Sequence, residues 1–171
     1  MQKKRKLFKV KYTNYFTAKR YIITYTELKY YKDLLEIATN LNLILLTKVS
    51  IYNLVQLKDT LYIPIGKKQC GNETIDFILS EKDSCRMRVC IQLDDPYNKN
   101  KKKVKRNEFI NELFDELDIK LIRIKINEEY NKEYLESQIR KIVSEPIYWK
   151  KEYICIPSFY LLVFKEIIHS F

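Results

Sequence analysis

Two hydrophobic segments of this chain carry oxygen-bearing side chains where a buried strand normally has none. Asp76 interrupts the apolar run Ile75–Leu79, and Gln92, Asp94 and Asp95 close the segment RVCIQLDD. Alternate side chains of an extended strand share a face, so Gln92 and Asp94 project the same way, about 7 Å apart. If Asp76 faces the same way on a neighbouring strand, three oxygen ligands meet over one spot.

A site of this kind suits a hard divalent cation, Mg²⁺ or Mn²⁺. Such ions take oxygen ligands, usually one or two carboxylates together with waters and substrate phosphate. The bound ion would polarise a scissile phosphate and help to generate hydroxide from water. A simpler interpretation is that Asp94 and Asp95 open an ordinary turn, DDPYN, because Asp is favoured in turns. That interpretation leaves Asp76 unexplained.

A basic segment follows the acidic one. Residues 99–106 contain no acid, and we expect a loop that contacts backbone phosphate and stabilises transition-state charge. Its basic residues are Lys99, Lys101, Lys102, Lys103, Lys105 and Arg106. Residues 1–20 carry eight further basic residues and again no acid, and the whole chain has a formal net charge of +10. Concentrated charge favours a polyanion, usually nucleic acid, through counterion release. A solvated surface in a lysine-rich chain explains the charge equally well.

Composition limits the class of protein. The 171 residues, of which 46% are hydrophobic and only two are Gly, suffice for one domain with a buried core and argue against disorder. The four cysteines form no CxxC pair and no pairing with the single His169, so we expect buried, reduced thiols in a cytoplasmic protein. The longest apolar stretch, residues 153–164, contains Pro157 and is too short to span a bilayer, so we expect no membrane association.

Hydrophobic periodicity predicts a mixed α/β domain. Helical spacing predicts three helices, over residues 28–41, 107–117 and 130–143. Strand patterns predict five strands, over residues 43–51, 61–65, 74–79, 87–93 and 120–126. The segments 74–79 and 87–93 are expected to pair as a hairpin. Thr24 and Glu27 stand at capping-box spacing ahead of the first helix.

The chain divides into three parts by composition. A basic extension over residues 1–20 precedes an α/β domain over 21–145, and an apolar extension over 146–171 follows. We expect the last part to pack on the domain or on a partner, which leaves a homodimer through this tail open. The helix residues expected to face inward are Phe109, Ile110, Leu113, Phe114 and Leu117 in one helix and Tyr134, Leu135, Ile139 and Ile142 in another.

The order of these segments resembles the PD-(D/E)XK nuclease superfamily. More closely, it is similar to a bacterial branch of unknown function related to very-short-patch repair endonucleases. The resemblance covers roughly residues 20–140 and rests on five segments: TYTELKYYKDL from Thr24, IDF from Ile75, IQLDDPYN from Ile91, RNEF from Arg106 and LIRI from Leu121. It implies a single domain of restriction-endonuclease-like fold, in which helices flank a mixed central sheet.

The resemblance also implies an activity, the metal-dependent hydrolysis of DNA phosphodiester bonds. Asp76 would be the principal ligand of Mg²⁺ or Mn²⁺, with Gln92 and Asp94 completing the protein ligands. Glu27 would assist metal binding, although a capping box alone explains its presence. The residues expected to contact nucleic acid are Lys101, Lys102, Lys103, Lys105, Arg106 and Arg123. For Arg123, a simple charge on a strand edge is an equal alternative.

Three positions depart from the pattern of the similar branch. This chain has Gln92 where those proteins have Glu, Asn98 where they have His, and Asn107 where they have Asp. Each change lowers charge or basicity, and Asn98 cannot act as a general acid or base near neutral pH. Two alternatives to an active nuclease therefore stay open. One is a catalytically inactive relative that binds nucleic acid, and the other is a small interaction or scaffolding protein.

Overall fold

The computed structural model describes residues 17–56, 70, 73–95, 97, 100–126 and 130–146 of the chain. Its elements are, in order, α1 (Tyr25–Asn40), β1 (Leu43–Ser50), the short 3₁₀ helix η2 (Ile51–Asn53), β2 (Thr74–Glu81), β3 (Met87–Asp94), α3 (Lys101–Glu116), β4 (Leu121–Lys125) and α4 (Lys132–Ser144). The expected strand over 61–65, the turn residue Asn98, most of the extension 1–20 and nearly all of the extension 146–171 lie outside the described residues.

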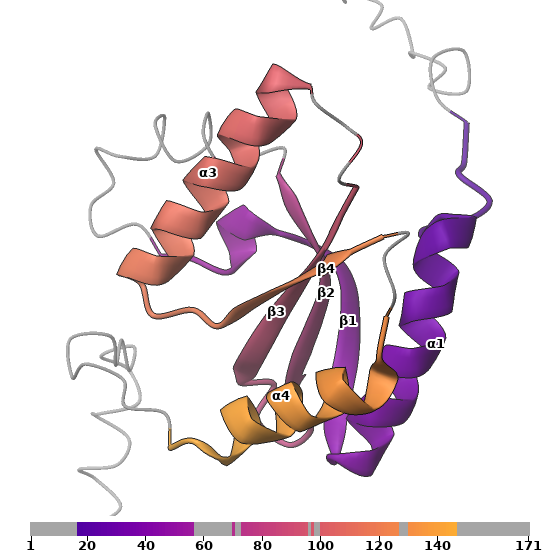
Figure 1. Ribbon diagram of the computed structural model, residues 1–171, viewed down its shortest axis with the longest axis vertical. Coiled ribbons are helices and arrows are strands. Elements are labelled where there is room, and N and C mark those ends of the chain that lie inside the picture. The colour runs from indigo at the N-terminus through magenta and orange to yellow at the C-terminus, as the bar shows by residue number, and fades with distance from the viewer. Residues whose placement is uncertain are drawn as a thin grey trace, which may run out of the picture.

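In the described part of the chain, the sheet has four strands in the order β1-β2-β3-β4. β1, β2 and β3 are antiparallel neighbours, whereas β4 runs parallel to β3. A parallel neighbour requires a crossover connection, and the segment containing α3 supplies it (Figure 1). The β2–β3 pairing confirms the expected hairpin. The mixed sheet and its three α-helices confirm a single α/β domain.

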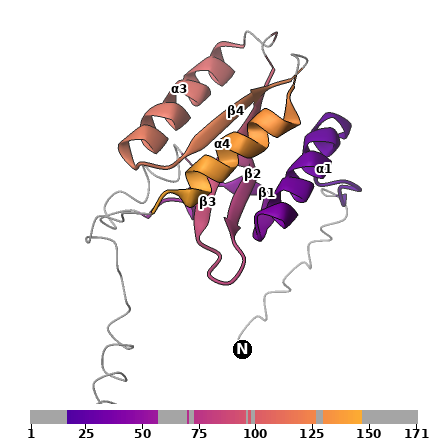
Figure 2. The same cartoon turned by 60° about the horizontal axis from the view of Figure 1, so that its bottom comes forward.

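Helices cover both faces of the sheet. α1 and α4 lie on one face and α3 on the other (Figure 2). Alternation along β3 explains how one strand serves both layers. Ile91 and Leu93 join the core beneath α1 and α4, while Cys90 joins the core beneath α3. Gln92 and Asp94, which alternate with Leu93, therefore face the α3 side.

The basic segment after β3 is helical, so the expectation of a basic loop is wrong. α3 begins at Lys101, well before the expected start at residue 107. The side chain of Asn100 caps this helix by accepting a hydrogen bond from the backbone N–H of Lys102 at 2.9 Å. Asn is a preferred N-cap and Lys has a good helix propensity. The lysines consequently occupy the first turns of a rigid element.

Two of the residues expected to face inward are exposed instead. Tyr134 is 63% and Leu117 37% exposed. A helix that packs on a single sheet buries one stripe only, and these residues lie outside that stripe. Tyr134 instead accepts a hydrogen bond from the side chain of Gln138 at 3.0 Å on the surface of α4.

The expectation of buried, reduced thiols is confirmed for Cys70 and Cys90, which are free and buried. It is wrong for Cys85, which is free but exposed. Cys155 lies outside the described residues. Within the described ranges, every helix is too short or too polar to cross a lipid bilayer.

Candidate functional site

Three polar residues lie side by side across three neighbouring strands. The β1–β2 register puts Lys48 opposite Asp76. The β2–β3 register, which pairs Phe77 with Ile91, puts Asp76 opposite Gln92 one step further along. Asp76 is 6% and Gln92 4% exposed. The fold thus brings two of the expected site residues together inside the sheet.

The Asp76 carboxylate is the centre of this arrangement. Its Oδ1 accepts a hydrogen bond from Lys48 Nζ at 2.7 Å. Its Oδ2 accepts one from Gln92 Nε2 at 2.6 Å and one from the backbone N–H of Leu93 at 2.9 Å. Charge-assisted bonds of this kind compensate for the removal of a carboxylate from water. Asp76 is therefore a buried anion that three donors hold in place.

Glu27 of α1 joins the cluster through Lys48. Lys48 Nζ donates to Glu27 Oε1 at 2.5 Å. The other carboxylate oxygen of Glu27 accepts from the backbone N–H of Thr24 at 2.7 Å, and the Thr24 hydroxyl accepts from the Glu27 N–H at 3.3 Å. The capping box is therefore present, and it orients the Glu27 carboxylate so that its free oxygen points at Lys48. We call Glu27, Lys48, Asp76 and Gln92 the Asp76 cluster.

The charges of the Asp76 cluster stabilise one another. Burial by itself would lower the pKa of Lys48, but hydrogen bonds to Asp76 and Glu27 outweigh it, so the pKa lies above the ordinary value. Burial would raise the pKa of Glu27, but the Lys48 and Thr24 hydrogen bonds outweigh it, so that pKa is lowered. Lys48 is therefore an ammonium and Glu27 a carboxylate at neutral pH. As an ammonium, Lys48 can donate hydrogen bonds and positive charge but cannot accept a proton.

The backbone of Lys48 is strained. Lys48 has φ 53° although it lies within β1, and the other non-Gly residues with positive φ in the described part of the chain are Asn42, Cys85 and Asp118. Those three lie outside the helices and strands. A left-handed conformation costs a side-chain-bearing residue about 1–2 kcal/mol. Strain of this kind within a strand often marks a functional position.

Gln92 carries an unsatisfied buried acceptor. Its Nε2 donates to Asp76, whereas its Oε1 is buried and has no hydrogen-bond partner. Exchanging the two ends of the amide would set oxygen against the Asp76 carboxylate, so the hydrogen bond fixes the orientation. Leaving such an acceptor unpaired costs about 1–3 kcal/mol. A cation or an N–H or O–H donor from a ligand would satisfy it.

These groups fit a divalent cation in part. Asp76, Glu27 and the Gln92 amide offer oxygen atoms, which Mg²⁺ prefers. However, the described residues contain no group of three or more His, Cys, Asp or Glu side chains placed to hold a metal ion. The ammonium of Lys48 also stands between the two carboxylates. The oxygen donors thus fit the ion, while a resident positive charge occupies the space between two of them.

Asp94 lies on the same strand but takes different partners. Both of its oxygens accept from Arg123 Nη1, at 3.0 and 2.9 Å, and one accepts from the Asn107 amide at 3.3 Å. The Asn107 oxygen, like that of Gln92, is buried without a partner. Asp95 accepts from the backbone N–H of Tyr97 at 3.0 Å, as the turn interpretation expects. The structure therefore does not bring Asp94 or Asp95 onto Asp76.

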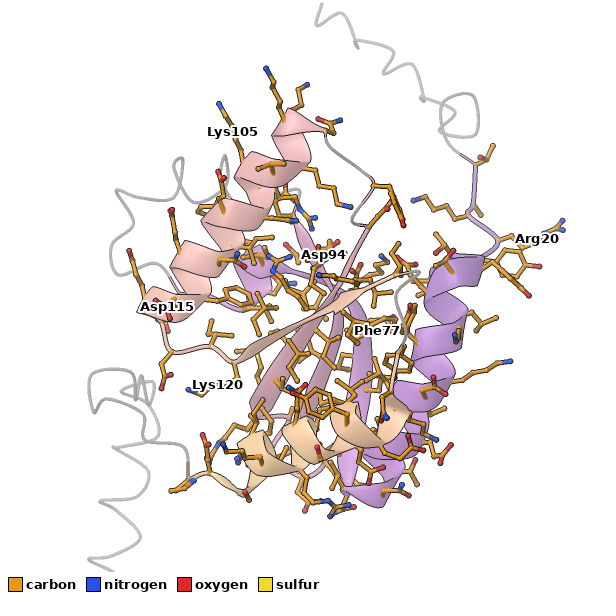
Figure 3. All side chains as sticks on the ribbon, viewed as in Figure 1. Arg20, Phe77, Asp94, Lys105, Asp115 and Lys120 are labelled. Carbon is orange, nitrogen blue, oxygen red and sulfur yellow. The ribbon has the colours of Figure 1, made fainter. Side chains whose placement is uncertain are left out.

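The expected nucleic-acid-binding residues divide into two groups. Arg106 forms an ion pair with Glu73 and donates to the Thr74 carbonyl at 2.9 Å, and Arg123 holds Asp94. Both thus stabilise the fold. The lysines lie on the first turns of α3, and they are Lys101, Lys102 and Lys105, which are exposed, and Lys103, which is half-buried. Helix N-termini carry partial positive charge, so lysines there concentrate positive potential. In the view of Figure 3, Lys105 and Arg20 lie on opposite sides of Asp94.

Comparison with known proteins gives a family but no activity. Residues 19–142 match the model of a family described as "Protein of unknown function (DUF2726)". The chain belongs to this family. No curated protein and no solved structure matches the chain. The matched residues include the whole Asp76 cluster and the lysines of α3, so the cluster lies inside the part of the chain that the DUF2726 family shares.

Lys48 is the member of the cluster that the sequence analysis missed. It stands within the segment LILLTKVS, and a charged residue there interrupts a strand as Asp76 does. The criterion that singled out Asp76 would therefore also have singled out Lys48. Its contacts with Glu27 and Asp76 span 21 and 28 residues of sequence, and no local pattern predicts such pairs.

Proposed function

We propose that this protein is a metal-dependent nuclease of restriction-endonuclease-like fold that hydrolyses DNA phosphodiester bonds. The observation that carries the proposal is the buried Asp76 carboxylate, which Lys48 and an amide with an unpartnered oxygen hold in place. The buried Gln92 oxygen opposes folding unless a ligand supplies it with a partner. The resemblance of the IDF and IQLDD segments to PD-(D/E)XK nucleases supports a divalent cation and a DNA phosphodiester as the ligands.

The Asp76 cluster would hold Mg²⁺ or Mn²⁺ through Asp76 and Glu27, and the Gln92 amide oxygen would join them if the ion replaced the hydrogen bond from Gln92 Nε2 to Asp76. Such an ion, when bound, polarises a phosphoryl oxygen and lowers the pKa of a bound water. Asp94 was expected to be a further ligand. Because Arg123 already neutralises it, we assign it the role of anchoring Arg123 and Asn107 beside the cluster.

Lys48 would act on the phosphate. Its Nζ carries three N–H donors, and Glu27 and Asp76 take two of them. The raised pKa keeps the group an ammonium. It can therefore stabilise negative charge on the transition state or donate a proton to the leaving oxygen. The exposed lysines of α3 would attract the DNA backbone, with an affinity that falls steeply with salt.

A second candidate is a catalytically inactive relative that binds nucleic acid. Three observations favour it: Gln92 brings no charge, Arg123 neutralises Asp94, and Lys48 fills the space between Glu27 and Asp76. The same lysines of α3 would serve this function without chemistry at the cluster.

Cleavage of supercoiled plasmid with Mg²⁺ or Mn²⁺ separates the candidates. We expect nicked or linear product from the wild type and at least about a hundredfold lower rate from Asp76→Ala, because a group that organises transition-state charge is lost. Asp83→Ala is the matched control, since Asp83 is an exposed aspartate in the turn between β2, which carries Asp76, and β3. DNA binding in a mobility shift without any cleavage would favour the inactive relative. No binding at low salt would exclude both and leave the interaction protein.

A further inference from the structure

Two carboxylates from distant elements aim at a single point. Glu27 Oε1 on α1 and Asp76 Oδ1 on β2 lie 2.5 and 2.7 Å from the same atom, Lys48 Nζ. The capping box holds Glu27, and Gln92 with the Leu93 N–H holds Asp76. Both oxygens are therefore fixed by other partners and would still face this point without Lys48. Two fixed carboxylate oxygens thus face one position, which the Lys48 ammonium occupies.

The lysine and a divalent cation compete for this point. With Lys48 in place the two carboxylates and the ammonium sum to one negative charge, and without it they sum to two. At the edge of a protein, a like charge about 4 Å away opposes binding by several times RT. A cation therefore binds weakly while Lys48 remains and more tightly once it leaves.

The Lys48 ammonium can move away from the two carboxylates toward solvent. Its side chain is 28% exposed, compared with 9% for Asp76, and its flexible four-carbon stem allows the ammonium to swing toward solvent. A backbone phosphate offers the oxygen acceptors that the ammonium would lose by leaving the carboxylates. The first turns of α1 and α3 lie at the same end of the sheet (Figure 1), so the lysines of α3 would bring such a phosphate to that end.

We propose that the ammonium of Lys48 is a built-in, exchangeable cation, which a substrate phosphate draws away from Glu27 and Asp76 so that a divalent cation can take its place. Cation and DNA then bind cooperatively, and each raises the affinity of the other by the same factor. The coupling rests on the proposed function, whereas the competition between Lys48 and the cation does not.

Ca²⁺ binding to the full chain tests the exchange without any turnover. Calorimetric titration with Ca²⁺ alone should show at least about tenfold tighter binding to Lys48→Met than to the wild type, because one like charge is removed. Lys132→Met is the matched control: Lys132 pairs with Glu36 at 2.6 Å and is also 28% exposed, yet its loss should leave Ca²⁺ affinity unchanged. Adding Glu27→Gln to Lys48→Met should abolish the gain. Circular dichroism establishes that each variant is folded, and Lys48→Gln serves in place of Lys48→Met if that variant is not.

A second titration tests the coupling. A short DNA duplex should raise the Ca²⁺ affinity of the wild type and have little effect on that of Lys48→Met. Equal Ca²⁺ affinity of wild type and Lys48→Met without DNA would overturn the exchange. A wild type that binds the duplex with no change in Ca²⁺ affinity would overturn the coupling. A chain that binds no duplex would refute the proposed nuclease and the coupling with it, while the comparison without DNA still decides the exchange.

Discussion

Replacing Gln92 by glutamate sets a second carboxylate against that of Asp76. The Gln92 Nε2 lies 2.6 Å from Asp76 Oδ2, so the introduced oxygen takes the place of a hydrogen-bond donor. Two carboxylates at this separation cannot both ionise without a counterion between them, and the pKa of one must rise. The substitution therefore makes stability depend on pH and on divalent cations, although it changes only one N–H₂ group into an oxygen.

The magnitude follows from two contributions. Losing a hydrogen bond to a charged acceptor costs about 1.5–3 kcal/mol, and leaving a buried charge without compensation costs about 3–5 kcal/mol. We therefore expect Gln92→Glu to lower the free energy of unfolding by about 4 kcal/mol at pH 8, which is about 8–16 °C in melting temperature for a chain of this size.

The pH dependence has a definite sign. The folded pKa of the introduced glutamate is raised above its unfolded value of about 4.3. Stability is then highest where the group is protonated and falls as pH rises through the folded pKa. A protonated carboxyl can also donate to Asp76 as the amide does. At pH 5 the variant should accordingly lie closer to the wild type than at pH 8.

Thermal melts at pH 5 and pH 8, with and without a divalent cation, measure the dependence of stability on pH and on cations. Mg²⁺ or Ca²⁺ at about 10 mM is sufficient to saturate a weak site of the extracellular type. Divalent cations should restore most of the loss at pH 8. Gln92→Met is the matched control, since it removes the donor without adding charge, and its loss should be independent of pH and cations. A Gln92→Glu variant with the same deficit at both pH values and no response to cations would refute the contact between these two side chains.

Three further outcomes follow from the described contacts. Arg88→Lys should lower the free energy of unfolding by about 2 kcal/mol and speed hydrogen exchange at the end of α4, because the Arg88 guanidinium donates to the last carbonyls of that region at 2.6–3.3 Å. Arg123→Lys should cost about 1–2 kcal/mol in urea unfolding, since lysine cannot keep both the Asp94 bond and the Asn111 bond. Iodoacetamide at pH 8 should label Cys85 and spare Cys90 in peptide mass maps, because burial raises the pKa of the Cys90 thiol to about 12.

The sequence predicts those parts of the fold that depend on local periodicity. The sequence predicts β2 and β3 because each is a short, largely apolar segment, and Asp76 stands out because it interrupts the first of them. α1 was predicted from its apolar spacing and capping box. These features depend on residues within a few positions of one another, which is the range over which secondary-structure signals act.

The features that the sequence does not predict depend on residues far apart in the chain or on local preferences that oppose each other. The run of charged lysines suggests a loop, but the Asn100 N-cap and the good helix propensity of Lys make this segment the start of α3. The sequence predicts that Asp94 lies beside Asp76, but its carboxylate accepts hydrogen bonds from Arg123, which is 29 residues away in sequence. The positive φ of Lys48 has no signal in residue type, since Gly, Asn and Asp are the usual occupants of that region.

The Asp76 cluster combines several features that a protein under selection for stability alone would lose. Lys48 is strained within a strand, the Gln92 oxygen is buried without a partner, and Asp76 is a charge inside the sheet. Apolar residues of similar volume usually replace such buried pairs without loss of stability, or with a gain. Departures from the usual backbone conformation, hydrogen bonding and burial of charge that occur together are expected at functional sites. Because the buried charge and the unpaired oxygen lie on adjacent strands and share a hydrogen bond, ligands bound at the cluster would offset the costs of both together.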